Sequence, residues 1–130
     1  MKWYSASILI ALIAAVVADQ KTYTDKWDNL DVTPIFRNSR LFLNYKECIL
    51  GKRVTGCPQE AVELKRVIPE ALSTRCAKCS DKQKDKMKDI LEKICAEQPE
   101  SFKEFLDRFD PTGEHRVAYE DKFGKLKGNC

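Results

Sequence analysis

Six cysteines are the residues of this chain with the greatest chemical potential. Cys76 and Cys79 enclose two residues, and the basic neighbours Arg75 and Lys78 are of the kind that activates thiols in dithiol redox sites. Such sites occur in a βαβ context, and no strand pattern accompanies this motif. The sequence therefore favours a structural role for this cysteine pair over redox catalysis.

By residue type, Cys48, Cys57, Cys76 and Cys79 could also hold a zinc ion. Cys48 and Cys57 enclose eight residues, however, which is a long gap for a metal-binding knuckle. We expect no metal and no cofactor in this protein.

Other residue types that serve catalysis are sparse. His115 is the single histidine, follows a turn-rich stretch and has no nearby nucleophile motif, so we expect it to be exposed. The carboxylate pairs Glu60 with Glu63 and Glu97 with Glu100 are interpreted as solvated helix faces. Five scattered glycines form no phosphate-binding loop. We expect no catalytic residues and no enzyme.

Residues 1–18 are typical of a secretory signal peptide. Lys2 gives a positive start, residues 8–17 are an apolar run, and Ala18 ends a small-residue cleavage site. A membrane anchor is the alternative, but the run is short for a span and the chain turns polar at Asp19. Cleavage would leave residues 19–130 as one secreted domain, in a compartment that favours disulfides.

Length and charge limit the remaining function classes. A chain of 130 residues has no room for two good cores. Lys2 is the one charged residue of the first eighteen, so residues 19–130 carry 22 basic against 20 acidic side chains. This balance argues against nucleic-acid binding, which needs a concentrated basic face.

Apolar residues recur at helical spacing, without the alternation that a sheet needs. The sequence therefore predicts an all-α fold, a compact bundle of about six short helices. We expect a first helix over 32–37, capped by Asp31. A second helix begins at a Ser39 cap and contains the apolar residues Phe42, Tyr45 and Ile49. A third extends from Pro58 to about Thr74, and Pro69 kinks or divides it. We expect three more, one from a Ser80–Gln83 capping box, one from Pro99 to a stop at 110–113, and a short one through Val117, Tyr119 and Phe123 before a frayed tail from Gly124.

Four cysteines permit three disulfide pairings, and the sequence alone does not choose among them. Geometry makes the local pairing attractive, because residues 51–56 can turn back and one helical turn separates Cys76 from Cys79. Cys95 is expected to be a buried free thiol on the apolar face of its helix. Cys130 could stay free, pair with Cys95 or cross-link two chains.

Several short motifs accompany the cysteine spacing C-x8-C-x18-C-x2-C. They are Tyr23-Thr24, Trp27-Asp28-Asn29, Asn44-Tyr45, Ile68-Pro69-Glu70-Ala71-Leu72, Cys76-Ala77-Lys78-Cys79-Ser80 and Phe109-Asp110-Pro111. Together they resemble the insect chemosensory proteins, from about Tyr23 to Phe123. The resemblance implies a small secreted six-helix protein with two short-loop disulfides between neighbouring cysteines. It also implies an internal apolar tunnel that carries fatty-chain odorants, pheromones or lipids.

The sequence departs from the family pattern at several positions. The first cysteine loop is longer than usual, Trp27 stands where tyrosine is usual, and Phe102 stands where tryptophan is usual. Cys95 and Cys130 are additional. These differences concern ligand and oligomeric state more than fold. We expect a monomer, with a covalent dimer through Cys130 as the alternative.

Ordinary core packing is the simplest interpretation of the apolar helix faces, but the resemblance implies that several of these residues line the tunnel. The candidate ligand-binding residues are Tyr45, Ile49, Leu64, Ile68, Leu72, Met87, Ile90, Leu91, Ile94, Phe102, Phe105 and Leu106. The Tyr45 hydroxyl could orient a polar head group. The alternative function is a secreted developmental or signalling protein that acts on a protein partner or membrane receptor through a surface apolar patch.

Overall fold

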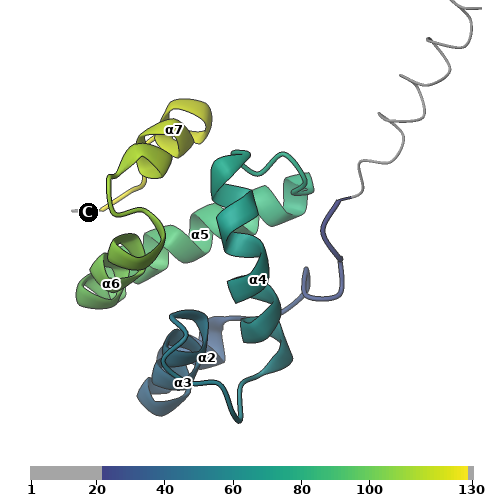
Figure 1. Cartoon of the computed structure of the whole chain (residues 1–130), viewed down its shortest axis with the longest axis vertical. Coiled ribbons are helices and arrows are strands. Elements are labelled where there is room, and N and C mark those ends of the chain that lie inside the picture. The colour runs from purple at the N-terminus through teal and green to yellow at the C-terminus, as the bar shows by residue number, and fades with distance from the viewer. Residues whose placement is uncertain (1–21, 129–130) are drawn as a thin grey trace, which may run out of the picture.

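The computed structural model describes residues 22–128, and within them every regular element is a helix (Figure 1). The helices are α2 (Thr33–Arg37), α3 (Ser39–Ile49), α4 (Gln59–Ser73), α5 (Asp81–Glu97), α6 (Pro99–Phe109) and α7 (Glu114–Phe123). The predicted all-α class is confirmed. None of the helices in this range is long and apolar enough to cross a bilayer. The predicted signal peptide and Cys130 lie outside the described residues.

Helix α4 connects the two ends of the molecule (Figure 1). At one end α3 packs against both α2 and α4, and at the other end α7 contacts α4. Helices α5 and α6 form a second packed pair. The helices therefore form two groups. One contains α2 and α3, the other contains α5, α6 and α7, and α4 contacts a helix of each group.

Side-chain caps mark the starts of two of the described helices, α3 and α5. The Ser80–Gln83 capping box is confirmed at the start of α5, with Gln83 N donating to Ser80 Oγ at 3.2 Å. The expected Ser39 cap is wrong, because Asn38 caps α3 by accepting a hydrogen bond from Leu41 N at 3.1 Å. The expected Asp31 cap is also displaced, because Val32 occupies the cap position of α2. The Asp31 carboxylate, one residue earlier, accepts a hydrogen bond from Thr33 N at 2.9 Å.

Pro69 lies inside α4 and does not divide it. Proline removes one backbone donor and leaves the carbonyl of Lys65 without its usual helical partner. Because Pro69 lies on the exposed side of α4, water can reach this part of the helix. The helix continues to Ser73, close to the predicted end.

Two apolar clusters replace a single core. The α5–α6–α7 cluster has Cys95, Phe102, Tyr119 and Leu126 as its buried members. The α3–α4 cluster has Cys48, Ile49 and Ala61 as its buried members. Helix α6 belongs to both clusters, because Phe102 and Leu106 pack in the first and Phe105 packs in the second.

The chain beyond α7 is packed rather than frayed. Leu126 is 9% exposed and belongs to the α5–α6–α7 cluster. Lys88 Nζ also donates to the carbonyl of Phe123 at 3.1 Å. The prediction of a frayed tail from Gly124 is therefore wrong for residues 124–126, because Leu126 packs in the cluster.

Both implied short-loop disulfides are present, Cys48–Cys57 and Cys76–Cys79. The first links the end of α3 to the loop before α4, and the second lies in the junction between α4 and α5. Cys95 is buried as expected, but it is disulfide-bonded and so is not the expected free thiol. None of the described cysteines is free.

Asp110 organises the start of α7. Its side chain accepts from His115 N at 3.0 Å and from Arg116 N at 2.8 Å, and it is 5% exposed. These are two of the first backbone donors of α7, which have no partner inside the helix. The turn closes through Gly113, whose φ of 77° favours glycine. Asp110 therefore acts as a cap from three residues before the formal cap position.

Replacing Asp110 with alanine is expected to lower the free energy of unfolding by about 1–2 kcal/mol, because two helix-terminal N–H groups lose their acceptor. Urea denaturation of the purified protein measures the change. Thr112→Ala is the control, since its exposed hydroxyl accepts only a long bond of 3.5 Å from Glu114 N. An equal effect of the two substitutions would contradict the capping role.

Candidate ligand-binding site

The two clusters collect most of the candidate ligand-binding residues. The α3–α4 cluster includes Tyr45, Ile49, Ile68 and Phe105. The α5–α6–α7 cluster includes Met87, Leu91, Ile94, Phe102 and Leu106. Because α6 supplies residues to both clusters, these two sets of side chains adjoin each other along this helix.

Three candidates lie outside both clusters. Leu64 is 43% exposed on the surface of α4. Leu72 lines a surface hollow near the end of the same helix, and Ile90 is half-buried on α5. Of the three candidate residues on α4, only Ile68 packs in the α3–α4 cluster.

Many of the clustered side chains are only partly covered by the chain itself. Met87, Leu91, Ile94 and Leu106 pack against the buried members of their cluster and retain partial exposure. Apolar area left in contact with water forfeits about 25 cal/mol per Å² that burial would contribute. A bound alkyl chain that covered these side chains would recover part of this free energy.

The described part of the chain has surface hollows, two of which are similar in size. One, of about 550 Å³, lies between the end of α4 and the start of α7 and includes Leu72, Arg75 and His115. The other, of about 560 Å³, lies beside α3 and includes Leu41 and Leu43. Both have mixed polar and apolar walls. The apolar tunnel expected from the family resemblance stays a prediction.

His115 is half-buried in the first hollow, with 30% of its side chain exposed. The expectation of an exposed histidine is therefore wrong. His115 lies in the first turn of α7, and Leu72 and Ser73 from the end of α4 line the same hollow.

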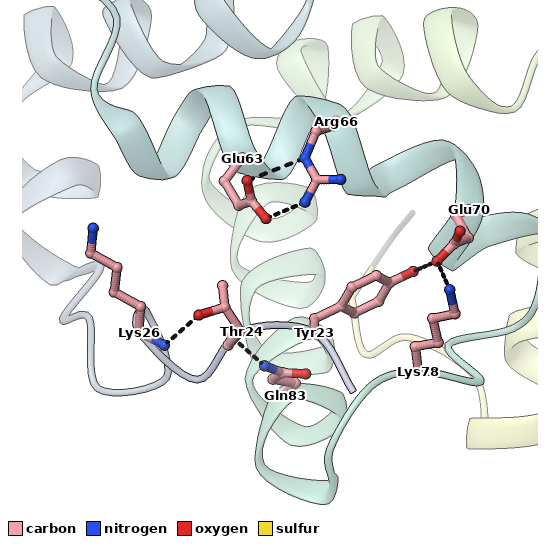
Figure 2. Close-up of polar contacts among 8 residues, drawn as sticks. All are labelled: Tyr23, Thr24, Lys26, Glu63, Arg66, Glu70, Lys78 and Gln83. Carbon is pink, nitrogen blue, oxygen red and sulfur yellow. Dashed lines mark hydrogen bonds and ion pairs between the residues drawn. The ribbon is translucent and has the colours of Figure 1, made fainter. Parts of the chain in front are cut away.

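Tyr45 on α3 and Glu60 on α4 form a hydrogen-bonded pair, in which the tyrosine hydroxyl donates to the carboxylate. Burial and this bond to Glu60 raise the pKa of Tyr45 to about 12. The interpretation of Glu60 as a solvated helix residue is wrong, because it is half-buried against Tyr45. Glu63 is half-buried as well, with 31% of its side chain exposed, and it pairs with Arg66 (Figure 2).

Sequence reasoning missed Glu60 because its partner is fifteen residues away, and periodicity gives no signal for a polar contact between two helices. The pair places a hydroxyl and a carboxylate beside the α3–α4 cluster. Both groups have lone pairs that can accept a hydrogen bond from a ligand.

The segment before α2 forms an N-terminal strap (residues 22–32) across α4 and α5 (Figure 2). Tyr23 donates through its hydroxyl to Glu70 at 2.9 Å and through its backbone N–H to the carbonyl of Lys78 at 3.0 Å. Gln83 Nε2 on α5 donates to the carbonyl of Thr24 at 3.0 Å. Trp27 follows in the strap, half-buried, with the Lys26 ammonium 4.7 Å from its ring centre.

Comparison with known proteins agrees with this architecture. The model of the insect pheromone-binding family A10/OS-D matches residues 23–117. Ejaculatory bulb-specific protein 3 of Drosophila melanogaster is 38% identical over 113 residues, which are 85% of each chain. Allergen Tha p 1 of Thaumetopoea pityocampa is 34% identical over 107 residues, which are 82% of this chain and 83% of the relative.

Solved structures give the same result. A chemosensory protein in complex with bromo-dodecanol is 33% identical, with a TM-score of 0.68 over 78% of this chain and 99% of that one. The solution structure of CSPsg4 is 36% identical, with a TM-score of 0.58 over 83% and 99%. Fold, disulfide pattern and sequence together define an all-α protein of the chemosensory class. The chain belongs to the insect pheromone-binding family A10/OS-D.

Replacing Glu60 with glutamine is expected to lower the pKa of Tyr45 from about 12, because the neutral phenol loses a charged hydrogen-bond acceptor. The ring ¹³Cζ shift of Tyr45, followed by NMR through alkaline pH, measures this. The stabilisation from a raised tyrosine pKa is complete below the unfolded value near 10 and is lost as pH rises to about 12. Glu63→Gln is the control, and an unchanged Tyr45 titration in Glu60→Gln would contradict the pair.

Proposed function

We propose that this protein is a secreted carrier that binds and solubilises small hydrophobic ligands, such as fatty-chain odorants, pheromones or lipids. The observation that carries the proposal is the division of the apolar residues into two clusters, with partly exposed side chains along α6. The bromo-dodecanol complex of a relative supports the same class of ligand.

In this proposal the ligand's alkyl chain lies along α6 and covers the partly exposed members of the clusters. Desolvation supplies roughly 0.8 kcal/mol for each buried methylene, or on the order of 10 kcal/mol gross for a long chain. The loss of ligand motion removes a large part of this gain. Methylenes make no directional contacts, so we infer micromolar affinity with weak selectivity. Met87 suits such a site because methionine fills irregular shapes.

We further infer that residues 1–18 direct secretion and that residues 19–130 act as a monomer. An intact mass measured under non-reducing conditions separates this monomer from a covalent dimer through Cys130. The alternative function, signalling through a protein partner, would use the surface residues Leu43, Val54 and Val62, which are 44%, 82% and 54% exposed.

A chain-length series of primary alcohols is expected to bind with an optimum. Affinity should rise by up to about fourfold per added methylene while the chain is being covered, and then fall when the chain exceeds the available length. Displacement of a fluorescent fatty probe measures the series. No binding of any apolar ligand would reject the carrier function and favour the signalling alternative.

Tyr45→Phe is expected to weaken binding of alcohols by about three- to tenfold and to leave hydrocarbons of equal length nearly unaffected. The reason is that Tyr45 donates to Glu60, so its oxygen remains available to accept from a ligand hydroxyl. Displacement assays with matched pairs of ligands measure the difference. Equal loss for alcohols and hydrocarbons would reject the head-group role of Tyr45.

A further inference from the structure

Cys95 has a disulfide partner that the two short-loop disulfides do not account for. Cys95 is disulfide-bonded, whereas Cys48–Cys57 and Cys76–Cys79 are each complete in themselves. The chain has six cysteines, so Cys130 is the one that remains. If the partner of Cys95 belongs to the same chain, it is therefore Cys130.

The C-terminal tail (residues 124–130) begins beside the helix that carries Cys95. Leu126 is 9% exposed and shares the α5–α6–α7 cluster with Cys95, which is 5% exposed. Lys88 Nζ on α5 also donates to the carbonyl of Phe123, directly before the tail, at 3.1 Å. An apolar contact and a hydrogen bond therefore hold the start of the tail against the cluster that contains Cys95.

The remaining chain is long enough to connect Leu126 with Cys95. Cys130 is the fourth residue after Leu126, and an extended chain spans about 3.6 Å per residue, or roughly 14 Å in all. A disulfide requires its two Cα atoms to lie about 4.4–6.8 Å apart. Because Leu126 and Cys95 are buried in one cluster, Cys130 is within reach of Cys95.

The burial of Cys95 argues against a bond between two chains. Cys95 belongs to one cluster with Phe102, Tyr119 and Leu126, and a cysteine of a second molecule would have to enter this cluster to reach it. A dimer through Cys130 of each chain would leave Cys95 as a thiol, which differs from its bonded state.

We propose that Cys95 and Cys130 form a third disulfide, which tethers the C-terminal tail to the α5–α6–α7 cluster. Bond formation removes one proton and one electron from each thiol. A disulfide compound of the secretory compartment, such as glutathione disulfide, accepts them by thiol–disulfide exchange and leaves as two thiols. This supply of oxidant rests on the proposed secretion.

The third disulfide encloses much more of the chain than the other two. Residues 96–129, a stretch of 34, lie between its cysteines and include α6 and α7, whereas the short loops enclose eight and two residues. A longer loop restricts the unfolded chain more strongly. The third disulfide therefore holds α6, α7 and the tail together as one closed unit.

A consequence for ligand exchange follows from the proposed carrier function. The ligand's alkyl chain would cover partly exposed members of the α5–α6–α7 cluster, such as Met87 and Leu91. Leu126 packs in the same cluster, so a tethered tail restricts how this cluster opens. The third disulfide then slows the release of a bound ligand.

A peptide map of the complete chain, expressed in insect cells and purified without a reductant, tests the bond itself. Free thiols are alkylated in denaturant before digestion with trypsin. The expected product is the peptide 94–103, which contains Cys95, joined to the peptide 128–130, which contains Cys130. Alkylated Cys95 or a dimer of the peptide 128–130 would overturn the third disulfide.

Cys130→Ser removes the bond by a change at the last residue and leaves the buried Cys95 side chain in place. The Leu126 amide is expected to exchange its hydrogen at least about tenfold faster in this variant, because the tail is no longer held at both ends. Lys125→Ala is the matched control, since it alters an exposed side chain of the same tail and keeps both cysteines. Equal exchange in wild type and Cys130→Ser would overturn the tether.

Release of a fluorescent fatty probe separates this proposal from the carrier function. The probe is expected to dissociate at least about threefold faster from Cys130→Ser than from wild type or Lys125→Ala. Equal rates in all three proteins would overturn the effect of the tether on ligand exchange. A probe that binds none of them would overturn the carrier function, and the peptide map would still decide the disulfide.

Discussion

Helix α6 is the packing element on which the rest of the structure depends. Phe102 and Leu106 complete one apolar cluster and Phe105 enters the other, so among the described helices α6 is the one that supplies side chains to both clusters. A polar link fixes its position, because Lys46 on α3 lies 3.2 Å from the Glu104 carboxylate. Small clusters with partly exposed members can rearrange around a fixed helix more readily than one close-packed core.

Local restraints compensate for the limited core. Each disulfide closes a short loop, which contributes little loop entropy but holds a junction between helices. The second lies where Arg75 and Cys76 adopt positive φ angles of 52° and 60°, a conformation that side chains of L-residues rarely take. The N-terminal strap adds hydrogen bonds over the same junction. Rigidity is therefore concentrated at the α4–α5 turn.

The sequence predicted features that depend on near neighbours. The Ser80–Gln83 box and the stop after Phe109 were readable because their signals lie within a few residues of each other. The Asn38 cap was missed because serine at position 39 is an equally good signal, and only backbone geometry decides between them. The sequence pattern did not predict the surroundings of Glu60, Tyr119 and Leu126. These residues contact elements that are distant in the sequence, and the local spacing of residues does not indicate such contacts.

The position of Trp27 has a consequence for spectroscopy. The chain has two tryptophans, and cleavage after Ala18 would remove Trp3. The remaining indole lies in the N-terminal strap beside Lys26, whereas Phe102 occupies the α5–α6–α7 cluster. Intrinsic emission would then report on the docking of the strap.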